Sequence, residues 1–270
     1  MGGSIESRLP GRDLTLRMAS GAVLALVGLG AVHAGGGWFI ALVGAVALLL
    51  VYEWDRIAEN NGLGLLAFVH GGFVTAALAF GVLDRFWIAF LLIALGTLVS
   101  ALIAAGRGGL RPWPMLVVAY VALPCLAMLW LRFEPQSGTG LTYWLLISIW
   151  ATDTGAYAAG RTIGGPKLAP RISPKKTWAG LIGGVVAAML AGGLTAAAVD
   201  LPRPLVFALV SGLIGAWSQI GDLAESALKR HFGVKDSSNL IPGHGGFLDR
   251  LDGLLFAAPV AALAVLLGAL

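Results

Sequence analysis

The sequence is poor in charge and in the residues that bind transition metals. Only 12% of its 270 residues are Asp, Glu, Lys or Arg, whereas 58% are hydrophobic. A soluble domain carries about twice that charged share. The single cysteine, Cys125, excludes an internal disulfide, and the Cys and His residues form no spacing typical of a zinc site. The composition therefore excludes a soluble domain and a disulfide-stabilised fold, and favours a membrane protein.

Long apolar runs occupy most of the chain. A helix needs about 20 mostly apolar residues to cross a bilayer, whereas strands of a membrane barrel would alternate over about ten residues. The runs therefore predict an all-α, polytopic integral membrane protein with about nine transmembrane helices. The first run is too long for a cleaved signal peptide, so we expect it to remain. The approximate spans are 16–33, 37–53, 63–83, 86–105, 113–131, 141–160, 178–199, 204–224 and 253–270, of which 141–160 and 204–224 are the weakest.

The basic residues favour one orientation of these helices. With a cytoplasmic N-terminus, 15 of the 18 Lys and Arg residues lie inside, and only Arg85, Arg132 and Arg203 lie outside. This asymmetry follows the positive-inside rule. The expected parts are a basic cytoplasmic segment 1–15, a scaffold 16–135 of about five helices, and a working region 141–270 of about four helices with cytoplasmic loops 161–177 and 225–252.

Charge is concentrated in residues 221–252, GDLAESALKRHFGVKDSSNLIPGHGGFLDRLD, which hold five acids, four Lys/Arg and two His. Asp222 and Glu225 share a helix face, and Asp249 and Asp252 do likewise. Hard oxygen ligands without cysteine favour Mg²⁺, which takes one or two carboxylates and completes its shell with water and phosphates. The alternative is a set of ion pairs among these acids and bases. The bases that could bind phosphate are Lys229, Arg230, Lys235 and Arg250.

Three further features could take part in chemistry, and each has a structural alternative. Asp153 is an acid inside an apolar run, which is costly unless it faces water, a metal or a partner such as Arg161. His244, in the glycine-rich turn PGHGG, could donate to a phosphate or simply lie in a tight turn. His70 is assigned to structure. Ser173, Lys175, Lys176 and Thr177 precede a predicted helix, whose N-terminus could bind phosphate, or they could contact anionic lipid heads.

These residues together predict a membrane enzyme that handles phosphates with Mg²⁺ at one membrane face. The alternative is a transporter of an anionic substrate, built on broken helices with a site near the bilayer midplane. Two observations favour the enzyme: the charge lies at one face, and the acids are clustered as ligands.

The segment 226–252 closely resembles the signature of the phosphatidate cytidylyltransferases, or CDP-diacylglycerol synthases. The matching positions are Ser226, Lys229-Arg230, Lys235-Asp236, Pro242, His244-Gly245-Gly246, Asp249-Arg250 and Asp252. The blocks WATDTGAYAAGR at 150–161, ISPKKTW at 172–178 and GDLAES at 221–226 also resemble this family. Ala179 departs from it, because the family often has Glu after SPKKTW.

The resemblance implies a Mg²⁺-dependent reaction of CTP with phosphatidate that gives CDP-diacylglycerol and pyrophosphate. It also implies a homodimer in the cell's inner (plasma) membrane, with the active site facing the cytoplasm and no nucleic-acid partner. Metal binding maps onto Asp222 and Asp249, with Asp153 and Asp252 as further candidates. The expected catalytic residues are Asp222, Asp249, Lys229, Arg250 and His244. The expected substrate-binding residues are Ser173, Lys175, Lys176, Thr177, Ser226, Arg230, Lys235, Asp236, Gly245 and Gly246.

Overall fold

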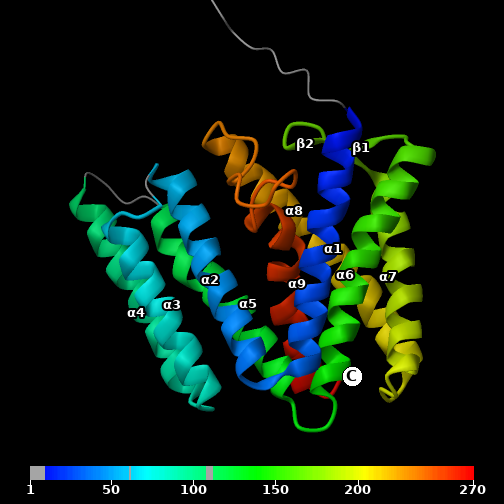
Figure 1. The fold of residues 1–270 in the computed structure, drawn as a ribbon, viewed down its shortest axis with the longest axis horizontal. Coiled ribbons are helices and arrows are strands. Elements are labelled where there is room, and N and C mark those ends of the chain that lie inside the picture. Colours follow the sequence, from blue (N-terminus) through cyan, green and yellow to red (C-terminus); the bar gives the residue numbers. More distant parts are fainter. Residues whose placement is uncertain (1–9, 61, 108–111) are drawn as a thin grey trace, which may run out of the picture.

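A computed structural model describes residues 10–60, 62–107 and 112–270. Within these ranges the chain forms nine helices and one two-stranded hairpin (Figure 1). The expected all-α fold is thereby confirmed, with the hairpin as an addition. The elements are α1 Pro10–Ala34, α2 Gly36–Ala58, α3 Leu65–Val82, α4 Phe86–Gly106, α5 Pro112–Phe133, α6 Gly138–Thr162, β1 Lys167–Ala169, β2 Ser173–Thr177, α7 Trp178–Ala198, α8 Pro204–His231 and α9 Leu248–Leu266.

Six helices in the described ranges are long and apolar enough to cross a membrane: α2, α3, α4, α5, α7 and α8. The described apolar part of α1, Met18–Ala34, is shorter. Helices α6 and α9, which carry acids singled out above as site candidates, are not among these six. The chain is thus a multi-pass membrane protein. Residues 1–9 of the expected basic segment 1–15 lie outside the described residues.

Both segments that were expected to form cytoplasmic loops lie at the same end of the bundle. Figure 1 shows the β1–β2 hairpin and the α8–α9 connection there, with the C-terminus at the opposite end. Helix α8 continues to His231, about two turns beyond the predicted span end at residue 224. Because α8 is longer than the roughly 20 residues that cross a bilayer, its charged end can project beyond the apolar layer.

The segment 161–177 is ordered by pairing rather than left as an open loop. Strands β1 and β2 are antiparallel, with Lys167 opposite Thr177 and Ala169 opposite Ser173. The hairpin runs directly into α7, and Thr177 caps that helix by accepting a hydrogen bond from the Gly180 N–H (3.1 Å). Strand β2 is therefore fixed at the start of α7, and its Lys176 side chain reaches Asp222 of α8.

Small residues let α6, α7 and α8 approach closely. A Cβ on Gly184 of α7 would lie 2.9 Å from the carbonyl oxygen of Thr152 in α6, and one on Gly215 of α8 would lie 2.8 Å from Thr152 Oγ1. This packing through small residues is common between membrane helices, and it was the expected role of glycine inside the spans. The three helices form a tight unit that carries Asp153 and the charged end of α8.

Helix α5 links the N-terminal helices to α9. Its share of buried residues is the largest among the six candidate spans of the described ranges. The Tyr120 ring lies 4.6 Å from the Trp54 ring of α2 and 6.1 Å from the Phe256 ring of α9, measured between centroids. This packing brings the end of α2 against the start of α9. Nearby, Asp55 and His70 form a fully buried pair (2.8 Å), in line with a structural role for His70.

Candidate active site

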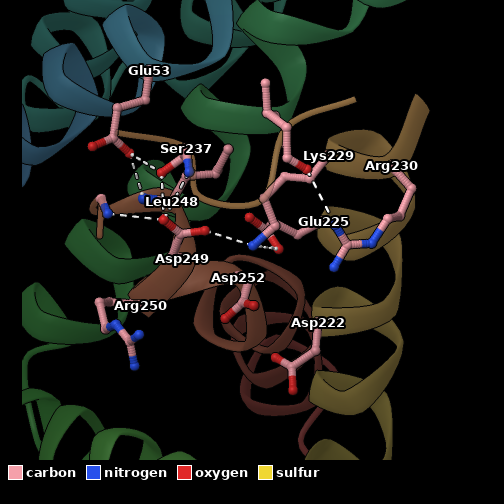
Figure 2. A network of polar contacts seen from close by, with 12 residues as sticks. Glu53, Asp222, Glu225, Lys229, Arg230, Ser237, Leu248, Asp249, Arg250 and Asp252 are labelled. Atoms are coloured by element: carbon pink, nitrogen blue, oxygen red, sulfur yellow. Dashed lines mark hydrogen bonds and ion pairs between the residues drawn. The ribbon is translucent and has the colours of Figure 1, made fainter. Parts of the chain in front are cut away.

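Lys229 joins two carboxylates at the meeting point of α8 and α9 (Figure 2). Its Nζ atom lies 2.7 Å from Glu225 Oε2, one helical turn earlier, and 2.6 Å from Asp249 Oδ1 in the first turn of α9. All three side chains are at most 12% exposed. Since an ammonium has three N–H groups and these contacts use two, one donor remains for a ligand.

The other oxygen of Asp249 is fully engaged by the protein. Oδ2 accepts hydrogen bonds from the Ser237 N–H (2.9 Å), the Ser237 hydroxyl (2.8 Å) and the Gly246 N–H (2.8 Å). Burial raises the pKa of this carboxyl, but the hydrogen bonds from Lys229, Gly246 and Ser237 and the charge of Lys229 outweigh it, so the pKa lies below its usual value. Asp249 is therefore a fixed anion.

The two glycines after His244 give Asp249 this close contact with backbone. Gly245 has φ +81°, a left-handed conformation that glycine adopts readily, and a Cβ there would lie 2.7 Å from Asp249 Oδ2. A Cβ on Gly246 would collide with Ser237 and Glu53. Direct substrate binding by these glycines stays a prediction, because their visible role is to fold the turn around the carboxylates.

Sequence reasoning missed Glu53, which reaches this turn from α2. The side chain is fully buried. Its carboxylate accepts hydrogen bonds from the hydroxyls of Ser237 (3.1 Å) and Ser238 (2.6 Å). It also accepts from the N–H groups of Phe247 (2.9 Å) and Leu248 (2.7 Å), where α9 begins. The signal in the sequence was an acid at the end of the apolar run 37–53, a costly position without partners.

Asp222 forms a second ion pair, with Lys176 of the hairpin (2.5 Å). Asp222 and Asp252 lie on facing helices in Figure 2. The helices approach closely at this point, because a Cβ on Gly253 would lie 3.4 Å from Asp222 Oδ1 and one on Gly221 would lie 2.5 Å from the Asp252 carbonyl oxygen. The predicted pair Asp222 and Asp249 is thus divided between two neighbouring clusters, each with its own lysine.

The carboxylates suit a hard cation such as Mg²⁺. Glu225 Oε1 is buried without a hydrogen-bond partner in the described chain, so the site holds an acceptor that its own donors do not satisfy. No group of three or more His, Cys, Asp or Glu residues in the described ranges is arranged to bind a metal. Mg²⁺ usually takes only one or two protein carboxylates, so a site without a larger cluster is compatible with this cation, and the magnesium site stays a prediction.

An apolar cavity of about 380 Å³ lies beside these clusters, between α1, α2, α5, α6 and α9. Most of its lining is aliphatic and aromatic, and its polar lining includes Asp153, His244 and Arg250. The His244 ring is held by Ser20 of α1 (Nδ1 to Oγ, 2.7 Å), and Arg250 Nε donates to the His244 carbonyl oxygen (3.0 Å). The cavity therefore joins the apolar bundle to charged side chains.

The remaining predicted residues lie around the clusters with fewer contacts. Arg161 donates to the Tyr157 hydroxyl (2.6 Å), and no ion pair with Asp153 is found in the described ranges. Arg230 donates to the Val234 carbonyl oxygen (3.3 Å), just beyond the end of α8. The substrate roles of these residues stay predictions. Lys175, Lys235 and Asp236 are exposed, and Ser173 and Ser226 are half-buried.

Comparison with known proteins places the chain in a family. The profile of the cytidylyltransferase family matches residues 15–267. The chain is 38% identical over 261 residues to the phosphatidate cytidylyltransferase of Brucella suis, covering 96% of this chain and 94% of that protein. It is 35% identical over 257 residues to that of Haemophilus influenzae, covering 82% of this chain and 88% of the relative. The match includes all the clusters described above, and the chain therefore belongs to the cytidylyltransferase family.

Proposed function

We propose that this protein is a phosphatidate cytidylyltransferase, which transfers the cytidylyl group of CTP to phosphatidate and releases pyrophosphate. The observation that carries the proposal is the apolar cavity whose polar lining, Asp153, His244 and Arg250, lies next to the lysine–carboxylate clusters. A substrate with acyl chains and a phosphate head needs such a combination. The relatives with matching full-length sequences bear the name of this activity.

The reaction places a limited demand on the protein. An oxygen of the phosphatidate phosphate attacks the α-phosphorus of CTP, the new P–O bond forms, and the bond to the β-phosphate oxygen breaks. A phosphate monoester is already an anionic nucleophile near neutral pH, so little general-base help is needed. Catalysis must come from alignment of two anions and from neutralisation of their charge.

The lysines and Arg250 supply this neutralisation. Lys229 has one N–H left after its contacts with Glu225 and Asp249, and Lys176 has two left after its contact with Asp222. Arg250 is exposed and lines the cavity, so its guanidinium can bind phosphate through two N–H groups. His244, held by Ser20, lines the same cavity and is suited to assist the leaving pyrophosphate.

Asp222 and Asp252 would hold Mg²⁺, with Asp153 near the polar end of the cavity and Asp249 bound to Lys229. When bound, Mg²⁺ would neutralise triphosphate charge and stabilise the leaving group. The active site would face the cytoplasm from the inner membrane, since most of the basic residues fall on that side. A homodimer, implied by the family resemblance, completes the proposal.

A transporter is less well supported. Transporter sites are typically formed by discontinuous helices near the bilayer midplane. In the described ranges each span is a single helix, and the ion pairs of Lys176 and Lys229 involve the charged end of α8. The arrangement favours chemistry at the surface over passage through the bundle.

The direct test is turnover by the purified protein in detergent with CTP, phosphatidate and Mg²⁺. We expect CDP-diacylglycerol and pyrophosphate in equal amounts, and no product when a chelator removes the divalent cation. Flux of an anion through proteoliposomes without CTP, together with no CDP-diacylglycerol, would contradict the enzyme and support the transporter.

The cavity offers a prediction about the lipid substrate. Ala25 of α1 lines the cavity, so Ala25→Trp should fill it and raise the KM for long-chain phosphatidate about tenfold, because overpacking costs about 1–3 kcal/mol. The KM for CTP should change little. Steady-state kinetics with each substrate varied in turn would measure both values.

Leu26, which follows Ala25 in α1, provides the matched control because it is 70% exposed and does not line the cavity. Leu26→Trp adds the same side chain on the outer face and should leave both KM values unchanged. Equal effects of the two substitutions on the phosphatidate KM would rule out this cavity as the acyl-chain site.

A further inference from the structure

We infer that Glu53 is a positioning residue for the reaction: from α2 it fixes the turn 237–248 and, through Ser237, sets the orientation of Asp249. This inference rests on the proposed function. It assigns a role in catalysis to a helix that the sequence placed in the scaffold. The contacts that carry it join residues 184 to 195 positions apart in the chain.

Each oxygen of Glu53 accepts two hydrogen bonds. Oε1 accepts from the Ser238 hydroxyl and the Phe247 N–H, and Oε2 accepts from the Ser237 hydroxyl and the Leu248 N–H. The side chain is fully buried and has no Lys or Arg partner among the ion pairs of the described ranges. A buried acid without a cation is costly, so four donors that converge on it indicate a specific structural purpose.

Two of these donors belong to the start of α9. The first N–H groups of a helix have no partner within it, and its N-terminus carries a partial positive charge. No side chain at the N-cap position, Phe247, caps α9 itself. Glu53 supplies that cap from another helix, and so fixes the position of the start of α9, which carries Asp249, Arg250 and Asp252.

The Ser237 hydroxyl connects Glu53 to Asp249. Its oxygen lies 3.1 Å from Glu53 Oε2 and 2.8 Å from Asp249 Oδ2. One hydroxyl has one proton, so it donates to only one of the two carboxylates at a time. The Ser237 N–H also donates to Asp249 Oδ2 (2.9 Å). Glu53 therefore holds Ser237, whose N–H and hydroxyl group both lie within hydrogen-bond distance of Asp249 Oδ2 as donors.

The consequence is a difference between the two oxygens of Asp249. Three donors from the turn occupy Oδ2, whereas Oδ1 accepts from Lys229 alone. A carboxylate oxygen offers about two lone-pair positions, so capacity for a further contact remains on Oδ1. Through Ser237, Glu53 thereby sets which oxygen of Asp249 is held by the turn and which one pairs with Lys229 and keeps room for a further contact.

The test compares Glu53→Gln with Asp55→Asn. Both remove the charge of a fully buried acid in α2, but Asp55 contacts His70 in the bundle and not the turn. We expect Glu53→Gln to lower kcat about 10- to 100-fold, as loss of orienting partners commonly does, with less than a threefold change in either KM. We also expect the rise in unfolding temperature on addition of CTP and Mg²⁺ to stay close to that of wild type, because substrate binding is kept.

Asp55→Asn should lower the unfolding temperature but leave the kcat of the folded enzyme within twofold of wild type. Equal kcat values for the two variants, per folded molecule, would overturn the inference. A wild-type protein that forms no CDP-diacylglycerol would instead contradict the proposed function, before any variant is compared, so the two failures are distinguishable.

Ser237→Ala tests the route itself and serves if Glu53→Gln does not fold. It keeps Glu53 and the turn backbone but removes the shared hydroxyl, and it should also lower kcat with little change in KM. In the double variant the two losses should be less than multiplicative, because both act on one path. Fully multiplicative losses, or a wild-type kcat for Ser237→Ala, would contradict the role of Ser237.

Discussion

Asp249→Asn should lower kcat by about a hundred- to a thousandfold, the loss seen when one preorganised electrostatic contact is removed from an active site. The reason is the set of donors around this side chain. Lys229 donates to one oxygen of this carboxylate, and Ser237 and Gly246 donate to the other. In either orientation of the Asn side chain, its NH₂ group would therefore face a donor instead of accepting from it. Lys229 would then keep only Glu225 as an ion-pair partner.

The measurement is single-turnover formation of CDP-diacylglycerol, together with the unfolding temperature in detergent. Asp84→Asn is a matched control. The substitution makes the same chemical change at Asp84, which is exposed in the turn between α3 and α4. Asn readily adopts the backbone conformation found there, with φ +58°. The control should keep full activity. A rate for Asp249→Asn within threefold of wild type would contradict a catalytic role for this carboxylate.

The spans could be predicted from the sequence because helix formation in a membrane depends on local apolar runs. The end of α8 could not, because hydropathy falls at Asp222 while the helix continues through Lys229 and Arg230 to His231. Hydropathy reports the apolar layer, whereas the hydrogen bonds and ion pairs of the last turns extend the helix beyond it. The β1–β2 hairpin escaped prediction because its strands are short and one contains Pro174.

The charged cluster was predicted from composition and spacing, but not its internal partners. Spacing along a helix places Asp222 and Glu225 on one face, and says nothing of how α8 is rotated against α9. In the structure α9 brings Asp249 to Lys229, and the β1–β2 hairpin brings Lys176 to Asp222. The ion pairs weighed as an alternative within this segment are therefore present at Lys229, whereas Lys176 pairs with Asp222 from outside the segment. Both lysines still have at least one N–H group for phosphate.

Glu53 shows what a single sequence cannot supply. An acid at the end of an apolar run is a local signal of function or pairing. Its partners, Ser237 and the start of α9, are reached only through the packing of α2 and α9 on α5. Contacts over such separations depend on tertiary structure, so the N-terminal half was assigned to scaffold alone.

Asp222→Asn is expected to have a comparably large effect, about a thousandfold on kcat at low Mg²⁺, because a carboxylate bound to a catalytic cation would be lost. Raising the Mg²⁺ concentration should recover part of the rate, since Asp252 remains on the facing helix. The experiment measures product formation across a Mg²⁺ titration. Asp200→Asn, at an exposed position with φ +54° between α7 and α8, is the control and should titrate like wild type.

Lys176 separates metal binding from simple ion pairing. If Asp222 serves only to hold Lys176 (2.5 Å), then Lys176→Met should cost as much as Asp222→Asn and leave the same Mg²⁺ dependence. If Asp222 binds the cation, Lys176→Met should lower kcat but keep the wild-type Mg²⁺ half-saturation, whereas Asp222→Asn should raise it about tenfold or more, as expected when about 1.4 kcal/mol of binding free energy is lost. Identical Mg²⁺ titrations for the two variants would remove Asp222 from the metal site and leave it as the partner that positions the hairpin lysine.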